Sequence, residues 1–209
     1  MKRYIMGRFK WNEESFDCVN WEAIEQARRG CSKKENIMVS KLMFDWINSG
    51  HKKAKMKKEK GCTCCGVEEE TLEHIFQCKH KQMCKVQDES FDVVTKTLQG
   101  IRCPDQVIRW FVEALKCLSE GKDITITGSI GKKAAAAIED QRRIIQHLML
   151  RGILSRKWRD AIAEYTKEKF SSKAGHLVKV IWKQVLNPMW NHRNMILHTE
   201  ESVASIKEQ

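Results

Sequence analysis

The stretch GCTCCGVEEETLEHIFQCKH at positions 61–80 has the residue types and the spacing of a metal site. Cys62 and Cys65 form a C-x2-C pair, and His74 and Cys78 follow as an H-x3-C pair. Thiolates and imidazoles are donors that zinc prefers, and a tetrahedral shell closed by four protein ligands is typical of a structural site. We therefore predict a structural Zn²⁺ bound by these four side chains, with no coordination position left for a reactive water.

A helix expected over residues 71–79 supports this assignment, because it places His74 and Cys78 on one helical face. Three other candidate donors lie within or beside the motif: Cys64, His80 and Cys84. Cys64 stands between the two thiols of the first pair and has to point away from the metal if both of them bind. Cys64 and His80 are each an alternative to one of the four predicted ligands, and Cys84 is a more remote one.

The composition indicates a helical protein with a substantial core. The chain has 209 residues, which is enough for one ordinary domain or two small ones. Hydrophobic residues make up 42% of it and include seven tryptophans, whereas two prolines and eleven glycines provide few tight turns. We predict a mainly α fold, a helical domain with a small CCHC zinc-binding insert made of a loop and a helix.

The nine cysteines do not indicate a disulfide framework, since their number is odd and five of them lie between Cys62 and Cys84. The opening MKRYIMGRFKW has too short an apolar run for a secretory signal, and no stretch is long enough to span a bilayer. We expect a reduced intracellular protein, nuclear or cytoplasmic, with no membrane partner.

A formal net charge of +11 indicates polyanionic partners, with nucleic acid ahead of a membrane surface. The run HKKAKMKKEK at 51–60 repels itself, and its place directly before the predicted metal loop favours a phosphate-contacting arm over a solvated linker. A second basic cluster follows the first predicted helix. The residues predicted to contact phosphates are Lys52, Lys53, Lys55, Lys57, Lys58, Lys60, Arg28, Arg29, Lys33 and Lys34. Without side chains placed to contact bases, such residues give affinity with little sequence specificity.

Turn and capping signals divide the rest of the chain into helices. Asn20 is expected to cap a helix over 19–27, Pro104 to open a helix that reaches Leu118, and Ser155 to cap a later one. Pro188 predicts a kink or a break near Asn187. Helices are also expected over 36–48, 88–98, from 134 to a stop at Gly152, and 176–198, and ITIT at 124–127 is the one candidate strand.

These signals predict five segments along the chain. They are the N-terminal helices at 1–50, the lysine-rich linker and zinc site at 51–84, helices that pack on this region at 85–118, an exposed loop at 119–133, and a C-terminal helical domain at 134–209.

With these residues laid out, the chain resembles the reverse-transcriptase-associated zinc finger, a region toward the carboxyl end of polyproteins from non-LTR retrotransposons, of the kind seen in algae and related protists. The resemblance spans roughly residues 20–198. The matching residues, in order, are Trp21, Ser40, Lys41, Cys62, Cys65, Gly66, Glu70, Thr71, His74, Cys78, Gln141, Gly152, Ser155, Trp158, Tyr165, Trp190, Arg193, Asn194 and His198.

The chain also departs from the pattern of that family. An aspartate usually precedes the first tryptophan, where this chain has Asn20, and a proline usually follows the first cysteine, where it has Thr63. A tryptophan is expected near Gln146, and Pro188 falls where such proteins run an uninterrupted helix. None of these departures removes a predicted ligand. They indicate a diverged or relic copy.

The resemblance implies a supporting role, in which a zinc-ordered domain helps the retroelement machinery to hold its RNA or its target DNA. A reverse transcriptase or a second copy of the chain is a further candidate partner, onto which the long C-terminal helices would dock. It does not imply a polymerase, because no Asp-Asp pair occurs in the chain to hold catalytic metals. We therefore predict a non-catalytic, zinc-stabilised nucleic-acid-binding module.

Two rival functions remain. The first is a protein-interaction or assembly domain with a purely structural zinc, which an exposed apolar strip along residues 176–198 would favour. The second is a nuclease, suggested by the H-x-N-x3-H pattern of His192, Asn194 and His198. On a helix, His192 and Asn194 point to different sides, so we expect Arg193, Asn194 and His198 to tie the last helix to its neighbours instead.

Overall fold

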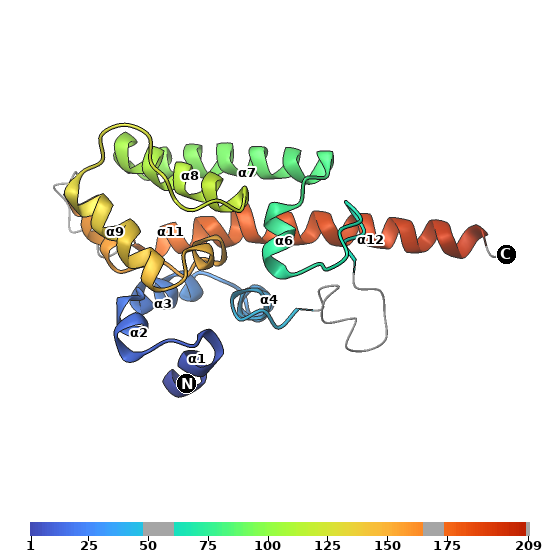
Figure 1. The fold of residues 1–209 in the computed structure, drawn as a ribbon, viewed down its shortest axis with the longest axis horizontal. Helices are drawn as coiled ribbons and strands as arrows, with labels where there is room; N and C mark the ends of the chain where they lie inside the picture. The colour runs from blue at the N-terminus through green and yellow to red at the C-terminus, as the bar shows by residue number, and fades with distance from the viewer. Residues whose placement is uncertain (48–60, 165–173, 208–209) are drawn as a thin grey trace.

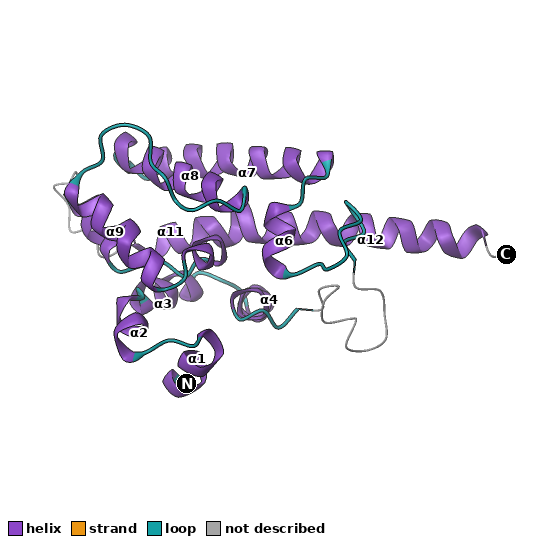
Figure 2. Cartoon of the chain, viewed as in Figure 1, coloured by secondary structure: helices purple, strands orange, loops and turns teal. Residues whose placement is uncertain are grey.

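In a computed structural model of the protein, the structure describes residues 1–47, 61–164 and 174–207, with side chains as far as residue 199. Helices joined by loops make up these ranges (Figure 2). No strand occurs within them, and their one β-type pairing is an isolated antiparallel bridge between Val19 and Ser155. The predicted mainly α fold is therefore confirmed, and the candidate strand at 124–127 is a loop.

The amino-terminal part forms short helices. They are α1 (Lys2–Phe9), α2 (Glu13–Cys18), α3 (Trp21–Arg29) and α4 (Lys33–Met43). Asn20 caps α3 as predicted, because its side-chain oxygen accepts a hydrogen bond from the backbone N–H of Ala23 at 3.0 Å. A capping box of Ser32 and Glu35 starts α4 three residues before the predicted start. The helix also ends before the predicted residue 48, and Asp45 then adopts a positive φ of 51°.

A helical hairpin follows the metal-site region. It consists of α7 (Lys81–Gly100) and α8 (Asp105–Ser119), which lie side by side (Figure 1), and it is preceded by the short α6 (Leu72–Gln77). Pro104 stands at the start of α8 as predicted. The first helix of the hairpin starts seven residues before the predicted 88, so residues 81–87 are helical as well.

Beyond α8 the chain departs most from the predicted boundaries. The helix expected from 134 to Gly152 is α9 (Lys132–Arg143) followed by the 3₁₀-helix η1 (Gln146–Arg151), with a break at Ile145, whose φ is 69°. The predicted cap Ser155 does not cap α10 (Lys157–Ala163). Its hydroxyl donates to the Ala137 carbonyl at 3.1 Å instead, because Ser155 is fully buried against α9.

The last helical run passes through the middle of the molecule (Figure 1). It comprises α11 (Ala174–Ile181), the π-helical turn η3 (Trp182–Leu186) and α12 (Asn187–Lys207). The break predicted at Pro188 is replaced by the wider π turn just before it, and the run continues along one direction. Its apolar side chains pack against α3 and α7, and at positions 176–198, all of which are described, only Met195 is an exposed large hydrophobic residue.

The apolar core extends through every predicted segment. Buried side chains at 1–47, 61–84, 85–118, 119–133 and 134–190 belong to one connected cluster. Phe111 of α8 meets Trp158 of α10 edge to face, with ring centroids 5.2 Å apart. The loop predicted at 119–133 is present but not wholly exposed, because Ile124 is buried within it. None of the described helices combines the length and the apolar composition that crossing a membrane requires.

Candidate metal centre

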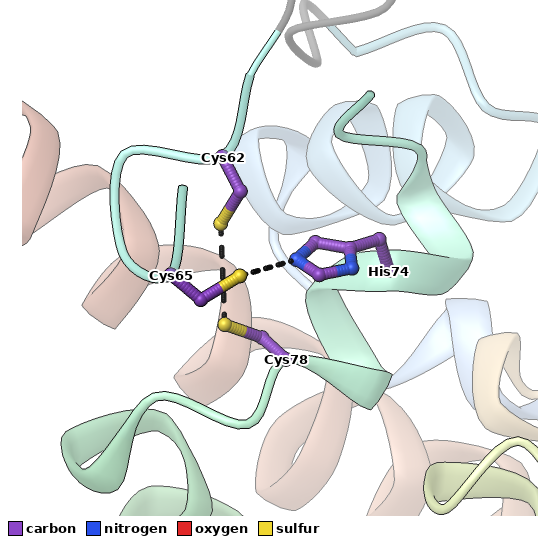
Figure 3. Close-up of side chains that lie close together, drawn as sticks. All are labelled: Cys62, Cys65, His74 and Cys78. Atoms are coloured by element: carbon purple, nitrogen blue, oxygen red, sulfur yellow. Dashed lines mark hydrogen bonds between the residues drawn. The ribbon is translucent and has the colours of Figure 1, made fainter. Parts of the chain in front are cut away.

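The two halves of the motif converge on one point. Sγ of Cys62, Cys65 and Cys78 and a ring nitrogen of His74 all lie within 4.8 Å of one another (Figure 3). This group is a set of donors that could hold a metal ion, and it consists of the four residues predicted from the spacing. Two of its members, Cys62 and Cys78, are buried, and Cys65 is exposed.

The interatomic distances suit a tetrahedral centre. With metal–sulfur bonds of about 2.3 Å and metal–nitrogen bonds of about 2.0 Å, a tetrahedron separates two sulfurs by about 3.8 Å and a sulfur from a nitrogen by about 3.5 Å. Sγ of Cys62 and Sγ of Cys78 are 3.9 Å apart, and Sγ of Cys65 is 3.2 Å from Nε2 of His74. Both distances are close to those of a four-coordinate centre, so the four residues fit such a metal.

A tight turn presents the first pair of thiols. The backbone N–H of Cys62 donates to the Val67 carbonyl at 2.9 Å, and the N–H of Gly66 donates back to the Cys62 carbonyl at 2.8 Å. Gly66 adopts a φ of 74°, the left-handed conformation that glycine tolerates best. The glycine after the C-x2-C pair thus has a conformational role, because it lets the chain turn back beside the thiols.

Helix α6 presents the second pair. Thr71 caps the helix by accepting a hydrogen bond from the backbone N–H of His74 at 3.0 Å, and the apolar residues Leu72, Ile75 and Phe76 fasten it to the core. The helix predicted over 71–79 ends at Gln77, because Cys78 already has extended backbone angles. Cys78 is therefore the residue directly after the helix, and its side chain reaches the centre from there.

The alternative donors surround the centre without belonging to the convergent group. Cys64 lies close enough to donate hydrogen bonds to Cys62, which raises the pKa of the Cys64 thiol to about 11. The Cys84 thiol donates to the Cys78 carbonyl at 3.6 Å. His80 stands at the start of α7 with its Nδ1 buried and not hydrogen-bonded.

Hydrogen bonding favours negative charge at the first thiol. Donation from Cys64 and then from Cys78 lowers the pKa of the Cys62 thiol, and the same hydrogen bond from Cys78 to Cys62 raises the pKa of Cys78. A thiolate is the form of cysteine that binds a metal. The surroundings therefore stabilise one ligand in its binding form.

A buried ion pair connects α12 to the loop that precedes α6. Glu70 and Arg193 are fully or almost fully buried, and the guanidinium binds the carboxylate through Nε at 2.8 Å and through a second nitrogen. Arg193 also donates to the side chain of Asn194 at 3.0 Å and lies 5.4 Å from the Trp190 ring centroid. Such a two-point contact holds the loop against the helix. The expected tie of the last helix to a neighbouring segment is thus present through Arg193, whereas the Asn194 contact lies within α12.

A second ion pair connects α6 to η1. Glu73, adjacent to His74, contacts the buried guanidinium of Arg151. Burial lowers the pKa of Arg151 to about 10, which is still well above neutral pH. Nε2 of His147 lies 3.4 Å from the same Glu73 carboxylate, and burial lowers the pKa of His147. The sequence reasoning did not find Glu73, Arg151 or His147, because nothing in their local spacing indicates that residues more than seventy positions apart meet.

The predicted phosphate-contacting residues fall into two sets. The six lysines from Lys52 to Lys60 lie outside the described residues. In the other set, Lys33 and Lys34 are exposed on the first turn of α4, Arg28 donates to the Ser40 hydroxyl at 2.9 Å, and Arg29 pairs with Glu25 at 2.6 Å. Lys33, Lys34 and Arg28 therefore keep their charge unpaired by any carboxylate in the described part of the chain.

Comparisons of the chain with protein-family models, with curated proteins and with solved structures found no match.

Proposed function

We propose that this chain is a non-catalytic, zinc-stabilised module that binds nucleic acid, an accessory or relic region of a non-LTR retroelement. The convergence of Cys62, Cys65, His74 and Cys78 within 4.8 Å is the observation that carries the proposal. The other features add to it the kind of metal, the kind of partner and the kind of parent protein.

The donor set favours zinc over other divalent ions. Three sulfurs and one imidazole nitrogen are unsuited to Mg²⁺ and Ca²⁺, which take oxygen ligands. When bound, zinc would supply a closed tetrahedral shell that holds the turn at residues 62–66 to the end of α6. The chain's own residues then connect this unit to the core, through Glu70 to Arg193 and through Glu73 to Arg151.

Charge and exposure favour a polyanion as the partner. The chain carries a net charge of +11, and Arg28, Lys33 and Lys34 have no carboxylate partner within the described ranges. Together with the six lysines at 52–60, they form the set that we expect to neutralise phosphates and release counterions.

The retroelement assignment is supported by what the resembling positions do. Glu70 and Arg193 form the buried ion pair, and Gln141 accepts a hydrogen bond from the Ser155 backbone N–H at 2.9 Å. Gly152 has a φ of 78° and packs on the Trp182 indole. Each of these residues makes a contact that stabilises the fold, as we expect if the matching positions preserve the family's structure.

A salt titration tests nucleic-acid binding. Fluorescence anisotropy with a labelled single-stranded RNA and a labelled DNA duplex is expected to show binding at low salt that falls linearly on a log–log plot. Each phosphate contact contributes about 0.7 to 0.9 to the slope. Replacing the six lysines of 52–60 with glutamine is expected to flatten the slope, whereas the same number of glutamines at exposed lysines of α7, α8 and α9 is expected to change it less. Absence of binding to both probes at low salt would contradict the proposal.

The non-catalytic part has its own test. Incubation of both nucleic acids with the protein and added magnesium is expected to leave them intact. Cleavage that disappears in His198→Ala would contradict this part of the proposal and would favour the nuclease rival.

A further inference from the structure

A groove beside α4 combines cations with an exposed aromatic ring. It has a volume of about 600 Å³ and lies between the end of α3, one face of α4 and the segment that follows α4. Its lining includes Arg28, Lys33, Ile37, Ser40, Lys41 and Trp46, and no carboxylate lines it among residues 1–47, 61–164 and 174–199.

Trp46 is unlike the other tryptophans of the chain. All seven are described, and Trp46 is the exposed one, with 49% of its surface accessible, while Trp21 is half-buried and the remaining five are buried. Ile37, on the α4 face of the same groove, is 50% accessible. Two large apolar side chains in the lining of one groove are thus exposed to solvent, which is unfavourable for apolar surface.

The indole of Trp46 is also held in place. Its Nε1 donates to the hydroxyl of Tyr4 at 3.0 Å, and its ring centroid lies 5.3 Å from that of Phe44 and 5.9 Å from that of Tyr4. The backbone N–H of Trp46 donates to the Lys41 carbonyl at 2.6 Å. A ring fixed in this way loses little conformational freedom when another flat ring stacks on it.

The cations of the groove are available to a ligand. Lys33 and Lys41 are exposed, and Arg28 is bound to the neutral hydroxyl of Ser40. None of the three has a carboxylate partner among the described residues. Two carboxylates on or just after α4 pair with other cations, since Asp45 pairs with Arg8 at 3.2 Å and Glu35 pairs with Lys183 at 3.2 Å.

We infer that this groove binds single-stranded nucleic acid, with a base stacked on Trp46 beside Ile37 and the flanking phosphates against Arg28, Lys33 and Lys41. The inference rests on the proposed function and narrows it to strands with unpaired bases. A duplex keeps its bases stacked on one another and cannot offer a base face to the indole, whereas a single strand can. Stacking on an aromatic ring accepts every base, which agrees with a module of low sequence specificity.

The aromatic contact is tested by Trp46→Ala and Trp46→Phe in the full chain. With a labelled oligouridylate and a labelled DNA hairpin duplex as probes, Trp46→Ala is expected to weaken single-strand binding about ten-fold and to leave duplex binding within about two-fold. Trp46→Phe keeps a stacking ring and is expected to retain most of the single-strand affinity. Circular dichroism and metal content of each variant establish that it is folded.

The charge contact is tested with a matched pair of double variants. Lys33→Gln with Lys41→Gln is expected to reduce the salt slope for the oligouridylate by about 1.4, because each lysine neutralises about one phosphate and each contact to a single strand contributes about 0.7. Lys96→Gln with Lys116→Gln removes the same charge from exposed positions on the α7–α8 hairpin, which lies across α12 from α4 (Figure 1), and is expected to leave the slope nearly unchanged.

The outcomes separate this inference from the proposed function. If the wild type binds both probes and folded Trp46→Ala binds the oligouridylate equally well, the groove assignment is wrong while the proposed function stands. If the wild type binds neither probe at low salt, both fail. If a polyglutamate peptide binds in a Trp46-dependent way and the oligouridylate does not displace it, the groove serves an acidic peptide and the inference is overturned.

Discussion

The metal-site region and the α3–α4 face use their charged residues in opposite ways. Around the metal site, Glu70 and Arg193 are buried and bound to each other, and Glu73 contacts the buried Arg151. On the α3–α4 face, Lys33 and Lys41 are exposed and have no carboxylate partner among the described residues. A buried charge that loses its partner is costly, whereas an exposed one is solvated by water.

This difference separates residues that hold the fold from residues that are free to bind. Substitutions around the metal site are expected to reduce stability and to affect nucleic-acid binding only through it. Substitutions on the α3–α4 face are expected to reduce binding and to leave stability almost unchanged.

Cys78→Ser is expected to have the largest effect, because it removes one of the four donors of the candidate metal centre. Structural zinc contributes on the order of 10 kcal/mol in small zinc-dependent domains, so loss of the metal is expected to unfold residues 61–78 and to loosen α12. Elemental analysis and circular dichroism measure the two consequences. Cys103→Ser changes a buried cysteine outside the group and is expected to keep the metal, and a metal-free but fully helical Cys78→Ser would contradict the prediction.

Arg193→Ala is expected to cost about 3–5 kcal/mol of unfolding free energy, because it leaves Glu70 buried without its partner. The control is Arg29→Ala, which breaks the exposed pair with Glu25 and is expected to cost less than about 1 kcal/mol. Urea denaturation followed by circular dichroism measures both. Equal costs for the two variants would show that the buried pair does not hold the loop to α12.

Gly152→Ala tests the corner that carries Arg151. At a φ of 78° an alanine is strained, and its Cβ would lie 2.3 Å from Nε1 of Trp182, so we expect a loss of about 2–4 kcal/mol. Gly128→Ala has a similar φ of 80° but nothing within 4 Å of the added Cβ, and it is expected to lose only about 1 kcal/mol. Thermal unfolding compares the two variants. If Gly128→Ala were as unstable as Gly152→Ala, the close approach of residue 152 to Trp182 would not be the cause of the loss.

Lys33→Gln with Lys34→Gln is expected to have the smallest effect on stability. Both side chains are exposed and have no carboxylate partner in the described part of the chain, so the midpoint of urea denaturation is expected to stay within error. The same variant is expected to weaken nucleic-acid binding and to lower its salt slope. A variant that is destabilised but binds normally would reverse the separation between the two regions.

The local features of the fold could be predicted from the sequence. The C-x2-C and H-x3-C spacing identified the four residues that converge, and Asn20 and Pro104 marked the starts of α3 and α8. In each case the deciding interaction lies within a few positions along the chain. The short-range pattern therefore contained enough information.

The failures occur where distant contacts decide. Ser155 has the residue type of a helix cap, yet its hydroxyl is bound to Ala137 of α9. Pro188 suggested a break, but the π turn at Trp182–Leu186 accommodates it while Trp182 is bound to the Arg151 carbonyl at 3.0 Å. Likewise the partners of Glu70 and Glu73 lie far along the chain, so the support of the metal site could not be read from local spacing.

Measurement of zinc in the purified protein, with circular dichroism before and after chelation, is the sharpest test of whether a metal orders residues 61–78. We expect one zinc per chain, and we expect that removal of the metal by a chelator lowers the helical signal and that added zinc restores it. A protein that purifies without metal and does not bind zinc, or one whose helical signal is unaffected by chelation, would contradict the claim that a metal orders this region.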